Sequence, residues 1–270
     1  MEIQSLGFRS EFIFLHHDGE VIDRGHYTVV RTLTNPNYFW GNLLIFEEPP
    51  QKGDYQNWNQ LFAKEFTDPR IYHRTFAWDS TESAIGDPSE FVENGYKLEA
   101  TAVLTAKANQ IRKPKKYNSD FEIRILESEE DWRQNIELQT KTGEAHMKES
   151  EWRDFATKQS VRYRAMSKSG LGHWFGAFEG KKLVASQGLF HADGVGRYQV
   201  IATDPDYRRR GIAATMVYEL ARHAFEKWFV KDLVMCADPG YFAIEIYKSV
   251  GFKQTLTQQG VYWWDKTRNP

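Results

Sequence analysis

The sequence predicts an α/β protein built from two lobes, each with strands packed against helices. Apolar residues recur every three to four positions after Gly211, which is typical of an amphipathic helix. Runs rich in β-branched and aromatic residues, such as His73 to Trp78, predict strands. Lysines, a proline and turn formers interrupt both patterns at 107–118. The sequence therefore predicts an N-terminal lobe at 1–115 and a C-terminal lobe at 116–270.

The elements of the first lobe follow from their own patterns. A helix is expected from Tyr55, because its apolar residues share one side: Trp58, Leu61, Phe62 and Phe66. The expected strands are His26 to Arg31, Tyr38 to Phe46, His73 to Trp78 and Leu98 to Thr105. Alternation of this kind predicts an α/β layer.

The second lobe is expected to alternate strands and helices. In order, the elements are a strand at Phe121 to Leu126, helices at Glu129 to Thr140 and Glu149 to Ser167, a hairpin around Glu179 to Lys181, a strand ending at Thr203, a helix from Ile212, a strand at Leu233 to Ala237 and a helix at Ala243 to Val250. The helix after Gly211 has a wide apolar side: Ile212, Met216, Val217, Leu220, Ala221, Ala224, Phe225 and Trp228. Gly251 is expected to cap the C-terminus of the helix at Ala243 to Val250.

Composition narrows the functional classes. The 270 residues are 41% hydrophobic, which is ample for packed cores. With 35 Lys and Arg against 37 Asp and Glu, the chain lacks the basic excess typical of nucleic-acid binders. No signal-like or membrane-length apolar stretch occurs, so a cytoplasmic location without membrane contact is expected.

The single cysteine limits redox and metal chemistry. Cys236 can form neither an intrachain disulfide nor, alone, a cysteine-based zinc site, so no metal is expected. It lies in the apolar strand Leu233 to Ala237, which favours a small buried hydrophobe over a nucleophile.

The basic turn before Gly211 predicts an anion site. A helix N-terminus carries partial positive charge and normally attracts acidic or hydroxyl side chains, yet three arginines, 208–210, precede it here. A bound phosphate would resolve the conflict, because the first backbone N–H groups point at it and Gly211 and Ala213 allow close approach. No P-loop is present, and strand-like sequence follows Gly170-x-Gly172, so the ordinary nucleotide folds are disfavoured.

At these residues the chain resembles a known family. Arg208-x-x-Gly211-x-Ala213, after a strand ending Thr203-x-Pro205, is similar to the pyrophosphate loop of the GNAT superfamily of N-acetyltransferases. Downstream, Tyr247-x-x-x-Gly251-Phe252 resembles a second motif of that family. The resemblance covers about Asn118 to the C-terminus. It implies a mixed central sheet flanked by helices, acetyl-coenzyme A as co-substrate, and a primary amine of a small molecule, peptide or protein as acceptor.

The resemblance also implies roles for individual residues. Tyr247 would protonate the leaving thiolate, with core packing as the alternative for that side chain. The central strand would pair with the pantetheine arm and supply backbone donors to the reacting oxygen through Ile201, Ala202 and Thr203. Arg208 would contribute a positive field. Backbone N–H groups for the diphosphate would come from Arg209, Arg210, Gly211, Ile212, Ala213 and Ala214.

Two features of the implied site stay open. Where family members often carry Asn, this chain has Gly240, so either Asp238 or the backbone alone would hold the pantetheine arm. The acceptor must also lose a proton, since an alkyl ammonium has a pKa near ~10. The candidates for a general base are His191, Tyr198, Gln199, Glu144 and His146, with a water chain as the alternative. Acceptor contacts are expected at 141–148.

The first lobe carries an echo of the second motif. Phe91-Val92-Glu93-Asn94-Gly95-Tyr96 repeats the aromatic-x-x-x-Gly-aromatic pattern before a strand, but no arginine-glycine loop precedes it. The lobe is either a degenerate copy of the GNAT fold, without coenzyme or catalysis, or an unrelated packing domain. It would wall the substrate cleft or mediate association, a homodimer being one form.

Three functional classes follow. The first is a coenzyme A-dependent N-acyltransferase. The second is a non-catalytic coenzyme A-binding sensor or regulatory protein that keeps the loop. The third is a nucleic-acid or protein-interaction module that uses the arginines, which the near-neutral charge disfavours.

Overall fold

The chain divides into two compact units in the computed structural model, which describes residues 1–32, 34–36, 38–143 and 148–268. Unit 1 comprises Met1–Val103, Cys236–Tyr241 and Gln254–Pro270, and unit 2 comprises Leu104–Met235 and Phe242–Lys253. The units interleave along the chain, so the predicted limits 1–115 and 116–270 stay a prediction about where two domains begin and end in the sequence.

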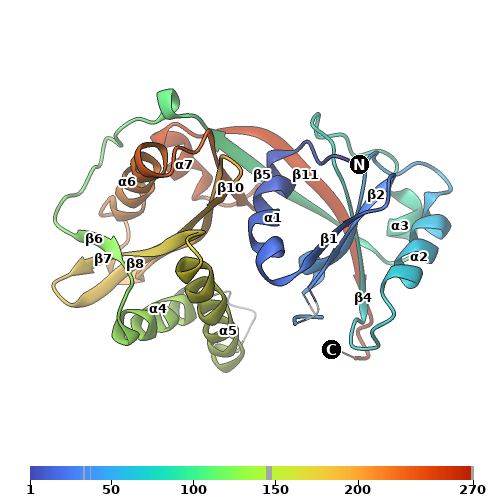
Figure 1. The fold of residues 1–270 in the computed structure, drawn as a ribbon, viewed down its shortest axis with the longest axis horizontal. Helices are drawn as coiled ribbons and strands as arrows, with labels where there is room; N and C mark the ends of the chain where they lie inside the picture. The colour runs from blue at the N-terminus through green and yellow to red at the C-terminus, as the bar shows by residue number, and fades with distance from the viewer. Residues whose placement is uncertain (33, 37, 144–147, 269–270) are drawn as a thin grey trace. The chain divides into compact units, whose positions relative to one another are not determined.

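Unit 1 is a mixed sheet with helices against it (Figure 1). Its elements are α1 (Leu6–Asp18), β1 (Glu20–Asp23), β2 (Tyr27–Arg31), the 3₁₀ turn η1 (Phe39–Gly41), β3 (Asn42–Phe46), α2 (Asp54–Glu65), β4 (His73–Trp78), α3 (Ser89–Glu93), most of β5 (Lys97–Ala106) and most of β11 (Lys253–Trp264). The strand order is β1-β2-β3-β4-β11-β5. Strands β3 and β4 are parallel, and β11 runs antiparallel to β4.

Two clusters of buried side chains form the core of unit 1. One is largely aromatic and includes Phe46, Trp58, Phe76 and Phe91, with the Phe46 ring stacked 3.7 Å from Trp58. The other packs Phe8 and Leu15 of α1 against Val30, Leu43 and Ile45 of the sheet. Aromatic rings of this size bury much apolar area and dominate such a core.

Unit 2 carries the remaining elements. They are β6 (Glu122–Ile125), α4 (Glu129–Thr142), α5 (Glu149–Lys168), β7 (Gly172–Glu179), β8 (Lys182–Ala192), β9 (Val195–Thr203), α6 (Ile212–Lys227), β10 (Asp232–Ala237) and α7 (Ile244–Val250), with 3₁₀ turns η2 (Ala108–Gln110) and η3 (Pro205–Tyr207). Their strand order is β10-β9-β8-β7-β6. Figure 1 shows α4 and α5 on one face of this sheet and α6 and α7 on the other.

The expected elements agree with the structure apart from two regions of unit 1. The N-terminal α1 and β1 were not expected. The predicted strand from Tyr38 is wrong in its first part, where Phe39–Gly41 forms a 3₁₀ turn. The side chain of Asn42 holds this turn, because its Nδ2 donates to the carbonyls of Asn35 (2.9 Å) and Tyr38 (3.0 Å) and its Oδ1 accepts from Thr32 N.

Candidate active site

The centre of unit 2 is a strand with one open edge. Strand β9 pairs in parallel with β10 only through Val195, Gly196 and Arg197, although it continues to Thr203. Beyond Arg197, that backbone edge of β9 has no register partner in β10 among the described residues. Such an edge can accept an extended, amide-bearing ligand as an added strand.

A β-bulge explains why β9 turns away from β10. Gly188 lies opposite Gln199 and Ser186 opposite Ala202, so Gln187 alone faces both Val200 and Ile201. Val200 adopts a φ of +41° and is 45% exposed. A positive φ is strained for a β-branched residue and costs on the order of 1 to 3 kcal/mol. The bulge bends the strand, which exposes its backbone next to the loop that follows.

That loop ends at Gly211, which a residue with a Cβ could replace only if neighbouring atoms moved. Gly211 caps α6 with a φ of +84°, and a Cβ built there would lie 2.0 Å from the carbonyl oxygen of Lys116. Arg209 also has a positive φ, +63°. Turns that contain left-handed residues can form a nest of backbone N–H groups that binds an anion.

The loop's carbonyl groups are occupied while its N–H groups are not. Lys116 Nζ donates to the carbonyl of Arg209, and Asn118 Nδ2 donates to that of Arg210 at 3.0 Å. Within the described parts of the chain, no acceptor is found for six consecutive N–H groups, those of residues 209–214. No side chain caps α6, and its first turn has no acidic residue. Unsatisfied N–H groups at a helix N-terminus attract an anion such as phosphate.

The arginine side chains add positive charge around these N–H groups. Arg208 and Arg209 are exposed, and Arg208 Nε donates to the carbonyl of Thr203 at 3.3 Å. Arg210 lies 3.9 Å from Glu179 and places its guanidinium 4.7 Å over the ring of Tyr207. An exposed ion pair at this distance neutralises little charge. The loop thus offers a net positive field to a ligand.

Asp204 anchors the end of β9 to α4. Its Oδ1 accepts from Lys141 Nζ at 2.7 Å and from the backbone N–H of Asp206 at 3.0 Å. Burial alone would raise the pKa of Asp204, but these hydrogen bonds and the Lys141 charge outweigh it and lower the pKa. These hydrogen bonds therefore hold the start of the loop in place.

Tyr247 lies on α7, which packs against α6 in the same unit. Its side chain is buried, with 6% exposed. The helix ends as the motif predicts: Gly251 has a φ of +118°, and Phe252 N donates to the carbonyl of Tyr247 at 3.2 Å. A Cβ at Gly251 would lie 2.0 Å from the carbonyl oxygen of Gln110.

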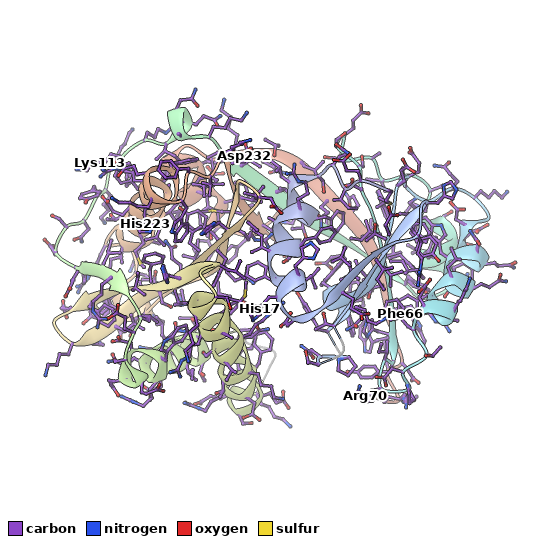
Figure 2. The ribbon with its side chains drawn as sticks, viewed as in Figure 1. His17, Phe66, Arg70, Lys113, His223 and Asp232 are labelled. Atoms are coloured by element: carbon purple, nitrogen blue, oxygen red, sulfur yellow. The ribbon has the colours of Figure 1, made fainter. Side chains whose placement is uncertain are left out.

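The segment 110–118, which we call the strap, therefore packs against two helix ends. These are the N-terminus of α6 at Gly211 and the C-terminus of α7 at Gly251. Besides Lys116 and Asn118 on the α6 side, Arg112 closes the C-terminus of α7 by donating from its N to Val250 O (2.9 Å) and from Nη2 to Lys248 O (2.8 Å). Lys113 of the strap and His223 of α6 are labelled in Figure 2. The sequence pattern placed the boundary between the two lobes in this segment but did not predict these contacts, because nothing in its composition indicates which carbonyls it contacts.

The candidate bases do not converge on the bulge. Tyr198 is buried and its hydroxyl donates to Val217 O at 2.8 Å, and burial raises its pKa well above 10. His191 pairs with Gly196 and stacks on Trp228 at 4.4 Å; its ladder position is four residues, or about 13 Å, from Gln187. Gln199 borders the bulge and donates to Tyr163 Oη at 3.1 Å, but an amide is no base. Glu144 and His146 lie outside the described residues.

Comparison with known proteins finds one family model that matches part of unit 2. The model described as "Acetyltransferase (GNAT) family" matches residues 132–252. No curated protein sequence matches the chain significantly.

Solved structures resemble the whole chain in fold. A functionally unknown conserved protein from Staphylococcus epidermidis matches with a TM-score of 0.75 at 12% identity over 92% of this chain and 95% of that one. A GCN5-related N-acetyltransferase from Kribbella flavida matches with a TM-score of 0.64 at 13% identity over 95% and 93%. Such identities show the fold alone.

A tandem GNAT protein from the clavulanic acid biosynthesis pathway bears on the first lobe. It matches with a TM-score of 0.53 at 10% identity, over 78% of this chain and 68% of that one. The predicted GNAT-like mixed sheet with a second α/β lobe is confirmed, and the likeness favours a second GNAT-like fold over an unrelated one.

Two features are absent from the described residues. No group of three or more His, Cys, Asp or Glu side chains is arranged to hold a metal ion there. In the same residues, every helix is too short or too polar to cross a bilayer.

Proposed function

We propose that the protein is an N-acyltransferase that moves the acetyl group of acetyl-coenzyme A to a primary amine. The observation that carries this proposal is the run of six N–H groups at residues 209–214 for which the described residues provide no acceptor, a few residues after the open edge of β9 ends at Thr203. A diphosphate fits the first feature, and the amide-bearing pantetheine arm fits the second.

The chain's own groups would act in sequence along this path. Backbone N–H groups of residues 209–214 bind the diphosphate, and the side chain of Arg208 adds positive charge. The edge of β9 pairs with the arm, and N–H groups of Ile201, Ala202 and Thr203 donate to the oxygen where negative charge develops. Gly240 has no side chain to hold the arm, so backbone pairing carries more of that binding.

Tyr247 is proposed as the proton donor to the leaving thiolate. Its support is the motif position, the burial of its side chain and the packing of α7 on α6. For the acceptor's proton we propose a water relay past Gln199, since Tyr198 and His191 are engaged elsewhere.

Thermal melts and product analysis test the proposal together. We expect acetyl-coenzyme A to raise the melting temperature, because the ligand binds only the folded state, and parallel melts with coenzyme A and longer acyl thioesters report which acyl group is preferred. Mass spectrometry of an amine library incubated with acetyl-coenzyme A should then show a gain of one acetyl group. Absence of stabilisation by every acyl thioester would refute the proposal.

A non-catalytic coenzyme A sensor is the second candidate. It is favoured by one observation, that His191, the candidate imidazole in the described part of the chain, stacks on Trp228 and lies four ladder positions from the bulge. Thiol release in the presence of the amine library discriminates the two. Stabilisation without thiol release would favour the sensor. A cytoplasmic location and a homodimer stay predictions.

A further inference from the structure

Unit 1 contains a cavity that the proposed chemistry has not used. Its volume is about 250 Å³, the space of about eight water molecules. It is lined from α1, β2, β3, β5 and β11, and by the last residues of β10 and the loop after it. A volume below that of drug-sized sites fits a small ligand.

The lining is mostly apolar and aromatic, and it includes two acidic residues. The apolar residues are Phe8, Leu15, Val30, Leu43, Ile45 and Ala237, joined by the rings of Tyr38 and Trp40. The charged residues of the lining are Glu11 and Asp238, both acidic, and the lining contains no Lys, Arg or His. Aromatic faces and carboxylates together favour an organic cation.

A third acid adjoins the lining. Glu99 lies two residues before Thr101 on β5, so both side chains share one face of the strand. Burial and, second, the negative charge of Asp238 raise the pKa of Glu99. The charge of Lys97 opposes these two effects and lowers the pKa of Glu99, while its Nζ lies 4.6 Å over the ring of Trp264. A ligand ammonium would relieve the repulsion between these two carboxylates.

We propose that this cavity binds a primary ammonium carried on a flat apolar body, with a carboxylate oxygen of Asp238 accepting from its N–H groups. The supporting observations are the aromatic rings of the lining and its two acidic residues, Glu11 and Asp238.

Calorimetry without coenzyme tests the cavity itself. We expect 2-phenylethylamine and tryptamine to bind at pH 7 at least tenfold more tightly than neutral 2-phenylethanol. Asp238→Asn should weaken the amines about tenfold, and Thr101→Leu, which fills the cavity, should weaken amine and alcohol alike. The matched control Glu93→Gln removes an exposed acid of unit 1 outside the lining and should bind as the wild type does.

Each other result overturns the assignment. Failure of both amines to bind, equal binding of the alcohol, or unchanged binding to both variants would do so. Melts of the wild type with acetyl-coenzyme A separate the two proposals. Stabilisation without amine binding leaves the transferase and removes the cavity site, and amine binding without stabilisation does the reverse.

Discussion

The two units repeat one order of elements but differ at the helix that follows the central strand. In unit 1 the order is β2, β3, α2, β4 and α3, and in unit 2 it is β8, β9, α6, β10 and α7. In both, the first pair is antiparallel and the strands around the first helix are parallel. Glycines with positive φ recur at matching places: Gly53 and Gly211 before the first helix, Gly95 and Gly251 after the second.

The central strand is closed in unit 1 and open in unit 2. Strand β3 pairs with β4 to its last residue, Phe46, whose carbonyl also accepts from Asp79 N at 2.9 Å. The ring of Phe46 stacks on Trp58 of α2. No edge remains for a ligand there, whereas β9 leaves β10 after Arg197.

The helix N-termini differ in charge as well. Glu47 and Glu48 follow β3, whereas three arginines precede Gly211. Asp54 occupies the first turn of α2, and Gly53 N donates to Glu90 Oε2 at 3.1 Å. Unit 1 thus neutralises its own helix terminus. The comparison teaches that a few residues around the helix start decide whether this topology offers positive charge and unpaired N–H groups to an anion or neutralises them.

The largest expected effect comes from placing a Cβ at the two matching glycines. Gly211→Ala forces the strap carbonyl of Lys116 away and should weaken acetyl-coenzyme A binding by about 100-fold or more. Gly53→Ala meets open space, so it should cost only the positive-φ strain, about 1 to 2 kcal/mol of unfolding free energy, with unchanged coenzyme affinity. Calorimetry and urea unfolding of both variants measure this. Equal losses of affinity would contradict the comparison.

Acid should destabilise unit 1 through His73. Burial lowers the pKa of His73 to about 4, against the opposing hydrogen bond of its Nε2 with Asn42 O at 3.2 Å. Between pH 6.5 and 4 the unfolded chain binds a proton that the folded chain does not, so stability falls as pH falls. The loss amounts to about 3 kcal/mol. Urea unfolding at pH 7 and 4.5 should show a smaller difference for His73→Gln than for the wild type, while the exposed His16→Gln should match the wild type.

Removing the charge of the loop should have a smaller effect than distorting it. The triple variant Arg208→Gln, Arg209→Gln, Arg210→Gln keeps the N–H groups, so acetyl-coenzyme A affinity should fall about 30-fold at low salt and less at high salt. Titrations at two salt concentrations measure it. A salt-independent loss would show that the arginines act through structure.

Tyr247→Phe should have the smallest of these effects. We expect kcat to fall about tenfold with KM for acetyl-coenzyme A within twofold, since only a proton donor is lost. Tyr96→Phe is the control in unit 1: it also removes a buried hydroxyl, which donates to Asn59 Oδ1 at 2.7 Å, and should leave kcat unchanged. Full kcat in Tyr247→Phe across pH would exclude the acid role.

Patterns within short stretches of sequence predicted the helices and strands whose structure depends on neighbouring residues alone. The stripe after Gly211 and the cap at Gly251 agree with α6 and α7, because periodicity and positive φ are properties of short segments. Helix α1 was missed because its apolar residues, Phe12 to Leu15 above all, are nearly continuous and form no stripe.

Features that depend on distant residues were beyond the sequence. The end of β9–β10 pairing at Arg197 and the bulge at Val200 arise from strand register. The contacts of Lys116 and Asn118 join residues more than ninety positions apart. The cavity of unit 1 likewise gathers residues from Phe8 to Gln258.

Hydrogen exchange of the loop amides tests the central claim most directly. With saturating acetyl-coenzyme A, the amides of residues 209–214 should exchange at least tenfold more slowly than in the free protein, while those at the matching start of α2, residues 52–57, should not change. Unchanged exchange at 209–214, or equal protection at both helix starts, would contradict the account.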